Sequence, residues 1–515
     1  MMIRQPITAV WEITMGCNMH CKHCGSACHE VLLGELTTQE ALRLCDAIGQ
    51  LGLKWVTLSG GEPTTRKDWP VIAGRLKELG VIPTMITNGW LFDEKILEQA
   101  IQAGVATIGF SLDGLQKTHD FMRREGSYQK TMRAIELCLS RNMNATAITT
   151  VNKMNLGELD GLKKELVDRG VKEWQVQIGC PMGNMAEHDD LVIEPADLDA
   201  IIDLAYRCMQ ESSIRINLGD CVGYYSLKEI EMTKSSQEGT YCRQCTAGKY
   251  TFGILHNGDI VGCTSIRNPE FTEDNVRNTP LREIWENPDS FSWSRTMKKE
   301  DLQGFCQVCR FAADCLGGCS NSRLTMGGSI YAENRYCSYF QAAQKRIRIF
   351  EEVQDDEELA AIGRSFTEKG YWQLAETALG VALRRQGSDS CLELLSHYGY
   401  VNFRLGNFYA ALEANDRVLQ RTPADVYGLK GKGLCLLRLG KPEEGIKLLQ
   451  KAVTLTDESF MDPYNDLAIA LWETGRKNEA IAVLEEGRKK SESFAAQSEH
   501  LYQQSVKKAS KAAEV

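Results

Sequence analysis

The distribution of cysteine constrains this chain more than any other feature of its sequence. Nineteen cysteines occur in 515 residues, and they are concentrated near residue 20 and between about residues 242 and 337. A chain of this length does not need disulfide staples, and its first residues lack the charged-then-apolar pattern of a secretory signal. We therefore expect a reducing, cytoplasmic setting, in which grouped cysteines indicate metal ligation.

Length, hydropathy and charge restrict the general class of protein. A chain of 515 residues predicts two to four domains. The composition is 43% hydrophobic and 25% charged, and no apolar run reaches the roughly 18 residues that would cross a bilayer. The net charge of -10 gives no general affinity for nucleic acid phosphates. We expect neither a membrane nor a nucleic acid partner.

The N-terminal region alternates short apolar runs with longer amphipathic stretches from Ile7 to about Gly183. Apolar runs such as 55–59 and 107–112 are typical of buried strands, and the stretches between them have helical periodicity. This rhythm predicts an α/β fold, a partial (β/α)6 TIM-like barrel over residues 1–234. In such folds the catalytic residues lie at the carboxyl ends of the strands.

The C-terminal region is helical in pattern and repeats itself. Similar segments centred on Gly406, Gly440 and Gly475 lie 34 and 35 residues apart, and a weaker copy surrounds Gly370. That period is typical of tetratricopeptide repeats, although an ordinary helical bundle with a chance periodicity is an alternative. We expect an all-α solenoid over residues 355–488 and a capping helix with a frayed tail over 489–515.

Cys17, Cys21 and Cys24 follow the first predicted strand directly. Three thiolates can hold a 4Fe-4S cube while leaving one iron open, and an open metal position is what a catalytic site requires. The alternative is a zinc site with His23 or Cys28 as the fourth ligand.

The spacing of these three cysteines resembles the signature of the radical S-adenosylmethionine superfamily. The resemblance implies that the reduced cube cleaves S-adenosylmethionine and that the resulting 5'-deoxyadenosyl radical abstracts a hydrogen atom. Segments after the second, third and fourth strands, and one in the helix beyond, are also similar to cofactor-binding segments of the family. The cofactor-binding residues implied are Gly60, Gly61, Glu62, Pro63, Asn88, Ser111, Asp113 and Arg123.

Two of these residues have a chemically specific expected role. By resemblance, Glu62 accepts a hydrogen bond from the cofactor ammonium, and Arg123 contacts the cofactor carboxylate, which suits the bidentate geometry of a guanidinium. The glycines Gly60 and Gly61 are expected to let the backbone approach the ligand closely, and Pro63 to fix the turn.

Residues 235–345 are rich in turns and cysteine and resemble the SPASM domain of radical enzymes that modify peptides and proteins. Eight cysteines can ligate two further 4Fe-4S cubes, which would make three clusters in all. The first auxiliary set implied is Cys242, Cys245, Cys263 and Cys319, with Cys221 as a possible substitute for Cys242. The second is Cys306, Cys309, Cys315 and Cys337. Two structural zinc sites are the alternative.

One other cysteine is a candidate catalytic residue. Cys180 lies at the end of a late strand, where a thiol facing the substrate could donate a hydrogen atom. The other cysteines outside the two groups are expected to be small buried hydrophobic residues.

These features favour a peptide maturase that installs a carbon-carbon, carbon-sulfur or carbon-oxygen cross-link in a ribosomally made peptide, with a flavodoxin or ferredoxin as electron donor. A formylglycine-forming maturase is an alternative, but that type carries an Asp after the cysteine that corresponds to Cys263, and Thr264 cannot act as a base near neutral pH. Peptide epimerisation is a second alternative, and a non-enzymatic repeat scaffold a third. Only 16 residues precede Cys17, so leader recognition is expected of the repeats.

Overall fold

The strands of the N-terminal region assemble because each has one apolar face. In β5 (Asn144–Val151), Ala145, Ala147, Thr149 and Val151 are buried, while Thr146, Ile148 and Thr150 between them are less buried. The same alternation occurs in β2 (Trp55–Gly60), β3 (Ile82–Thr87) and β6 (Glu173–Ile178), whereas β1 (Thr8–Thr14) and β4 (Thr107–Ser111) contain runs of buried residues. One face of the sheet therefore packs on helices, and the other faces the barrel interior.

The computed structural model describes residues 5–219, 222–235, 244–387 and 391–513, and within them one ten-stranded sheet. Strands β1 to β6 and β7 (Arg215–Leu218) pair in parallel in sequence order, which confirms the predicted α/β class and its six β/α units. The cysteine-rich segment extends the same sheet, because β8 (Thr251–Ile254) pairs in parallel with the free edge of β1. Strand β9 (Asp259–Val261) pairs antiparallel with β8, and β10 (Thr272–Asn275) pairs antiparallel with β9.

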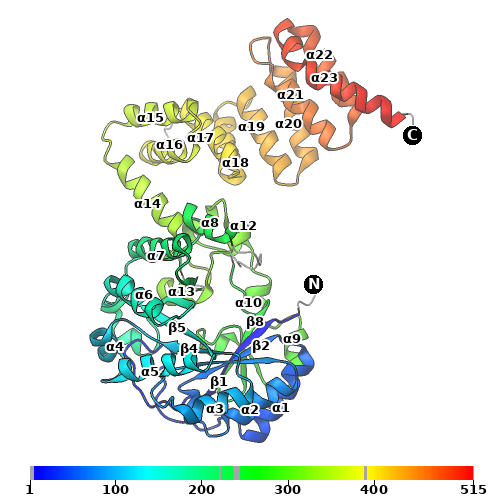
Figure 1. Cartoon of the computed structure of the whole chain (residues 1–515). Coiled ribbons are helices and arrows are strands. Elements are labelled where there is room, and N and C mark those ends of the chain that lie inside the picture. Colours follow the sequence, from blue (N-terminus) through cyan, green and yellow to red (C-terminus); the bar gives the residue numbers. More distant parts are fainter. Residues whose placement is uncertain (1–4, 220–221, 236–243, 388–390, 514–515) are drawn as a thin grey trace. The chain divides into compact units, whose positions relative to one another are not determined.

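Helices cover the outer face of the sheet (Figure 1). They are α1 (Thr38–Leu51), α2 (Trp69–Glu78), α3 (Glu94–Ala103), α4 (Gln116–Met122), α5 (Ser127–Ser140), α6 (Leu159–Asp168) and α7 (Leu198–Glu211). Local signals set their ends, as in α1, where Thr37 and Glu40 form a capping box and Gly52 ends the helix in the left-handed conformation. The shorter helices that follow are α8 (Leu227–Ser235), α9 (Leu281–Glu286), α10 (Ser292–Arg295), α11 (Gly304–Val308), α12 (Ala312–Cys315) and α13 (Ser320–Gly327).

The chain divides into two compact units, the first comprising residues 1–307 and 311–341 and the second residues 308–310 and 342–515. Helix α14 (Ser338–Glu351) spans the division. The domain limits at residues 234/235 and 345/355 remain predictions.

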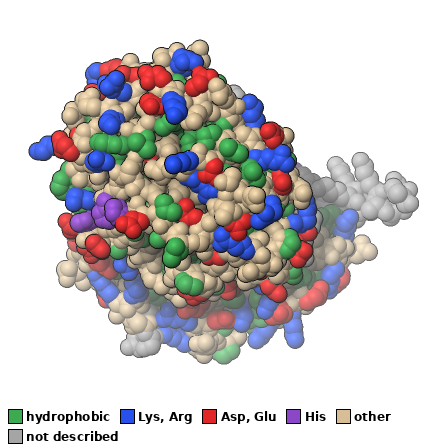
Figure 2. Space-filling view, turned by 90° about the horizontal axis from the view of Figure 1, so that it is seen from below, with side chains coloured by type: hydrophobic (Ala, Val, Ile, Leu, Met, Phe, Trp, Pro, Cys, Tyr) green, Lys and Arg blue, Asp and Glu red, His purple; other side chains and the backbone are tan. Residues whose placement is uncertain are grey.

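On the face of the molecule in Figure 2, basic and acidic side chains are interspersed rather than gathered into areas of one sign.

The second unit consists of antiparallel helix pairs, as the repeat period predicts. The described part contains α15 (Asp356–Glu368) with α16 (Trp372–Gln386), α17 (Leu392–Leu405) with α18 (Phe408–Arg421), α19 (Val426–Arg438) with α20 (Pro442–Leu455), and α21 (Asp462–Glu473) with α22 (Lys477–Lys490). A final helix, α23 (Glu492–Ala513), packs against α22. None of the described helices has the length and apolar character needed to cross a membrane.

Candidate active site

The loop that carries the first three cysteines begins where β1 ends. Glu35 fixes its start, because its Oε1 accepts hydrogen bonds from the Met15 amide at 2.7 Å and from the Thr14 hydroxyl at 3.0 Å. The Cys17 amide donates to the His29 carbonyl at 3.0 Å, which closes the loop. Residues 15–24, the cluster loop, thus place their cysteines at the carboxyl end of a barrel strand, as predicted.

The cysteines of the cluster loop influence one another electrostatically. Burial raises the pKa of Cys17, and it raises the pKa of Cys21 to about 12, with a further upward contribution from the neighbouring thiolates. The interaction between Cys24 and Cys28 lowers the pKa of Cys24 and raises that of Cys28, whose thiol lies 3.8 Å from Met15 Sδ. Cys24 therefore has the thiolate character that a metal ligand needs.

The geometry of the thiols does not converge on one ion. Among the described residues, no three His, Cys, Asp or Glu side chains surround a common single-metal position. A 4Fe-4S cube does not require such convergence, because each of its thiolates binds a different iron. The arrangement is therefore compatible with a cube, and it gives no support to the zinc site considered from sequence.

Asp113 and Arg123 form a buried ion pair beside the cluster loop. The Asp113 carboxylate pairs with Arg123 and with His23 Nε2, the latter at 3.0 Å. Burial alone would raise the pKa of Asp113, but the charges of Arg123 and His23 hold it well below its usual value. Arg123 Nη1 is also 3.8 Å from Cys21 Sγ. Asp113 thus holds the positive Arg123 guanidinium beside Cys21, and His23 is a further partner of Asp113 that the sequence suggested only as a zinc ligand.

Glu62 binds together two loops at the strand ends. Its carboxylate accepts hydrogen bonds from Thr64 (amide 3.1 Å, hydroxyl 2.6 Å), from the Thr87 hydroxyl at 2.8 Å and from the Asn88 amide at 2.7 Å. Burial raises its pKa, and these four donors oppose the shift. A carboxylate has about four acceptor positions, and three of the donors share Oε1, so Oε2 keeps one position for a ligand ammonium.

Gly60 and Gly61 are required by the protein backbone itself. A Cβ on Gly61 would lie 2.2 Å from the Gly16 carbonyl oxygen, and one on Gly60, at φ +127°, would lie 2.2 Å from that of Thr14. The Gly61 and Glu62 amides donate to these same carbonyls, at 2.7 and 2.9 Å. The sequence suggested that the two glycines let a ligand approach the backbone. The structure shows that they let the carbonyl groups of Thr14 and Gly16 approach it.

The remaining predicted residues lie around the same edge. Pro63 is buried at the start of a short 3-10 turn, and Ser111 is half-buried at the end of β4. The Asn88 side chain donates to Asn18 Oδ1 at 2.7 Å. The loop after β6, which contains Cys180, is tied to the cluster loop because Asn184 donates to the carbonyls of Cys24 and Cys21, both at 2.9 Å.

A buried ion pair between Glu12 and Arg267 was not predicted from the sequence. Arg267 bonds the Glu12 carboxylate and the hydroxyl of Ser26, which lies two residues beyond Cys24. Glu12 itself accepts a bond from Ser26 at 3.2 Å, and its side chain is 4% exposed. The pair joins β1, and through Ser26 the chain just beyond the cluster loop, to the segment that carries Cys263. A charged residue at an inward position of β1 was the available signal for Glu12, but nothing in the sequence indicated its partner.

The auxiliary cysteines are only partly described. Cys221 and Cys242 lie outside the described residues, and Cys309 belongs to the segment 308–310 of the second unit. Cys306, Cys315 and Cys319 are buried, and Cys245, Cys263 and Cys337 are partly buried. The Asn334 amide donates to Cys306 Sγ at 3.3 Å, while its side chain donates to the Gly317 carbonyl at 3.1 Å. Asn334 thus connects Cys306 to the turn between Cys315 and Cys319.

Arg323 shows that this region fits a negatively charged group. The side chain is 1% exposed and packs on Gly317, and its Nη2 donates to Ser320 Oγ at 3.1 Å. Its Nε and Nη1 have no hydrogen-bond partner in the described structure. Burial lowers the pKa of Arg323, and the nearby thiolates of Cys245, Cys306 and Cys319 oppose this. A buried guanidinium needs an anion, and a thiolate-ligated 4Fe-4S cube carries net negative charge.

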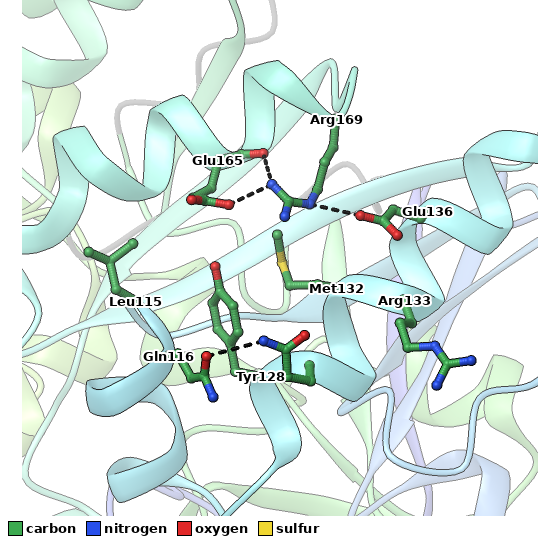
Figure 3. Close-up of a pocket in the computed structure, with 9 residues that line it drawn as sticks. Leu115, Gln116, Tyr128, Met132, Arg133, Glu136, Glu165 and Arg169 are labelled. Carbon is green, nitrogen blue, oxygen red and sulfur yellow. Dashed lines mark hydrogen bonds and ion pairs between the residues drawn. The ribbon is translucent and has the colours of Figure 1, made fainter.

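A separate cavity of about 420 Å³ lies among α4, α5 and α6. Figure 3 shows Arg169 on its rim between Glu136 and Glu165, with the Arg169 Nε 3.0 Å from Glu136. It contains no cysteine and none of the predicted site residues. Its charged groups neutralise one another, so it is not part of the candidate active site.

The close approach at Gly61 generates a prediction. Gly61→Ala is expected to displace the cluster loop, because the added methyl group cannot fit 2.2 Å from a backbone oxygen. The variant should lose iron binding at the first cluster and unfold at lower temperature. Gly74→Ala in α2 is the matched control, because a Cβ there meets nothing within 4 Å; it should keep its iron and gain up to about 1 kcal/mol from helix propensity. Full iron loading of Gly61→Ala, measured by chemical iron analysis after anaerobic reconstitution, would contradict this.

Three family models match the chain. The Radical SAM superfamily model matches residues 11–166, the SPASM iron-sulfur cluster-binding domain matches 241–310, and the tetratricopeptide repeat matches 361–426 and 403–460. The match for SPASM ends before Cys315, Cys319 and Cys337. These matches confirm the three resemblances found in the sequence.

Curated relatives and solved structures agree with the family models. The AdoMet-dependent heme synthase of Methanosarcina barkeri is 30% identical over 66% of this chain and 98% of its own length. The mycofactocin maturase MftC of Mycobacterium ulcerans is 26% identical over 62% of this chain and 85% of its own. The structure of Streptococcus suis SuiB bound to the precursor peptide SuiA shares the fold, with a TM-score of 0.53 at 18% identity over 64% of this chain and 75% of that one. The chain belongs to the radical SAM superfamily and is an enzyme of that superfamily, with 4Fe-4S clusters, S-adenosylmethionine, a SPASM domain and tetratricopeptide repeats.

Proposed function

We propose that this enzyme is a maturase that abstracts a hydrogen atom from a peptide or protein substrate and installs a cross-link in a ribosomally made peptide. The observation that carries the proposal is the group of neutral hydrogen-bonding side chains on the interior face of the barrel, in a chain that also bears a helical-repeat unit. The precursor peptide bound to SuiB and the maturase MftC are consistent with this substrate class.

The interior face of the sheet carries neutral polar side chains beside apolar ones such as Ile86 and Ile148. Thr84 donates to Thr57 at 2.9 Å, and Gln175, Gln177 and Thr150 form a further chain of hydrogen bonds at 3.0 and 3.3 Å. Neutral donors and acceptors of this kind suit the N–H and C=O groups of a peptide.

The charges on this face are already paired. On the interior positions of the described strands β1 to β7, Glu12 pairs with Arg267, and Arg215 on β7 pairs with Glu173 on β6 at 3.8 Å. No free cation is left on these described strands for the carboxylates of a substrate such as a porphyrin with propionate side chains. This is why the peptide proposal is preferred, although the 30% identical relative is a heme synthase.

The residues of the site have distinct proposed roles. Cys17, Cys21 and Cys24 would hold the catalytic cluster, and Glu62, Asn88, Ser111, Asp113 and Arg123 would surround S-adenosylmethionine. When bound, these groups supply an electron and a 5'-deoxyadenosyl radical. Arg123 provides positive charge beside Cys21, Asp113 fixes Arg123, and Glu62 holds the two loops and keeps one acceptor position for the ammonium. The interior residues orient the substrate.

Two auxiliary clusters would complete a set of three. Cross-link formation releases two electrons and two protons from the peptide, so a path for electrons is needed beyond the first hydrogen atom. The ligands proposed are Cys242, Cys245, Cys263 and Cys319 for one cube and Cys306, Cys309, Cys315 and Cys337 for the other, with Arg323 as a counter-ion.

Epimerisation is a second candidate reaction, because the loop bearing Cys180 is hydrogen-bonded to the cluster loop and a thiol there could return a hydrogen atom to the substrate.

Combined replacement of Cys17, Cys21 and Cys24 by Ala tests the catalytic cluster. Iron content is expected to fall from about twelve to about eight per chain, because one of three four-iron cubes is removed. Formation of 5'-deoxyadenosine under dithionite should be abolished, while the helical unit keeps its circular dichroism. Retained cleavage of S-adenosylmethionine by the triple variant would overturn the assignment, and a loss of more than one cube would contradict independent cluster loading.

Arg323→Met tests the counter-ion role. Removing a buried positive charge makes reduction of nearby clusters harder, so we expect their midpoint potential to fall by on the order of 60 mV, which is a tenfold change for one electron. The measurement is an EPR-monitored redox titration at equal iron content. Arg323→Lys, which keeps the charge, should shift the midpoint potential less. Arg335→Met is the control and should leave the potential unchanged, because the Arg335 side chain is 65% exposed. An unchanged potential in fully loaded Arg323→Met would refute the role.

The reaction itself is tested by mass spectrometry. The anaerobically reconstituted enzyme is incubated with S-adenosylmethionine, dithionite and candidate precursor peptides encoded near its gene. A loss of two hydrogens with formation of 5'-deoxyadenosine is expected for a cross-link. An unchanged mass with deuterium gained in D2O would indicate epimerisation instead, and turnover of a porphyrin carboxylate but of no peptide would reverse the choice of substrate class.

A further inference from the structure

A cluster of cations and aromatic rings lies on the outer surface beside the cluster loop. It consists of Lys22, Trp90, Phe121, Arg124 and Lys130 and is called the cationic patch below. The Trp90 ring is contacted by two cations, with Arg124 Cζ and Lys130 Nζ each 3.9 Å from the ring centroid. Lys22 Nζ lies 5.0 Å from the ring centroid of Phe121. The Phe121 side chain is 53% exposed, so part of this surface is apolar.

The cationic patch is attached directly to the loop that holds the catalytic cysteines. Arg124 Nη1 donates to the Asn18 carbonyl at 3.0 Å, and the Lys22 amide donates to the Met122 carbonyl at 2.9 Å. Lys22 is next to Cys21 in the chain, and Arg123, next to Arg124, is 3.8 Å from Cys21 Sγ. A single layer of side chains therefore separates this surface from a cluster ligand.

The charges of the cationic patch are not neutralised within the described part of the molecule. None of Lys22, Arg124 and Lys130 forms an ion pair with another residue in the described ranges, whereas Arg75 and Arg169 on neighbouring helices each bind two carboxylates. The chain as a whole carries a net charge of -10, so a local group of unpaired cations is contrary to its general balance. Like charges held around one ring repel one another, and an acidic partner surface would relieve this repulsion.

We propose that the cationic patch is the docking surface for a small acidic one-electron carrier protein that reduces the catalytic cluster. The inference rests on the proposed radical chemistry, which needs one electron for each cleavage of S-adenosylmethionine. One electron leaves the reduced carrier, which is oxidised by one electron, and enters the cluster, which is reduced by one electron; no atom is transferred. Phe121 and Trp90 supply the apolar contact, and the three cations give long-range attraction and orientation.

Charge reversal at Lys130 tests the proposal, because this exposed side chain contacts neither the cysteines nor the proposed cofactor residues. Formation of 5'-deoxyadenosine is measured with S-adenosylmethionine and either a photoreduced flavodoxin or dithionite as reductant. For Lys130→Glu, the KM for flavodoxin should rise about tenfold at low salt, and the difference should shrink as the ionic strength increases. The rate with dithionite should stay within about twofold of the parent, because a small reductant needs no docking surface.

Two further variants complete the experiment. Phe121→Ala should also raise the KM for flavodoxin, but with little salt dependence, because the interaction that this substitution removes is apolar. Lys164→Glu in α6 is the matched control, a 78% exposed lysine outside the patch, and should leave both assays unchanged. An unaltered flavodoxin KM in Lys130→Glu would overturn the docking site. A rise in the KM for the peptide with dithionite would show that the patch binds substrate instead. Absence of cleavage with dithionite in the parent protein would refute the radical activity and not the patch.

Discussion

The site depends on contact between two backbones at the carboxyl ends of β1 and β2. The amides of Gly61 and Glu62 bond to the carbonyls of Thr14 and Gly16, and only glycine leaves room for this approach. The contact sets the start of the cluster loop and, through the Glu62 carboxylate, the loop after β3 as well. Three strand ends are thus fixed relative to one another before any cofactor contributes, which is the preorganisation that radical chemistry requires.

Buried charge is the second theme of the molecule, and each instance indicates a chemical partner. Asp113 holds Arg123 beside Cys21, and Arg267 holds Glu12 beside the cluster loop. In each of these pairs the opposite charges balance, although Glu12 Oε2 and Arg267 Nε make no further hydrogen bond in the described structure. Arg323 is different, because it has no carboxylate partner in the described structure, two of its nitrogens lack hydrogen-bond partners there, and three cysteines lie near. An arginine in that state is costly unless an anion accompanies it, so the protein surroundings themselves argue for a negatively charged group at the auxiliary cysteines.

The proposed substrate class rests on the interior of the barrel more than on kinship. The chain is similar both to enzymes named for heme synthesis and to enzymes named as peptide maturases. Family membership therefore does not decide between a heme-type substrate and a peptide substrate. The neutral threonine and glutamine side chains of the interior support the proposed peptide substrate, because they can bind the N–H and C=O groups of a peptide and provide no charge to balance a polycarboxylate. The helical repeats add a surface of the type that binds extended peptides.

Local patterns in the sequence determined the strand and helix alternation, the repeat unit and the cysteines of the cluster loop, because each depends on residues close together in the chain. Asp113 could be placed at the site because it follows a strand of a parallel sheet, and Arg123 because its segment resembles one of the family. The tertiary structure alone decided that β8 joins β1, that Glu12 meets Arg267 across 255 residues, and that Arg124 and Lys130 meet on the ring of Trp90. Such pairings are set by how the elements pack, and single-sequence periodicity carries no information on which distant residues meet.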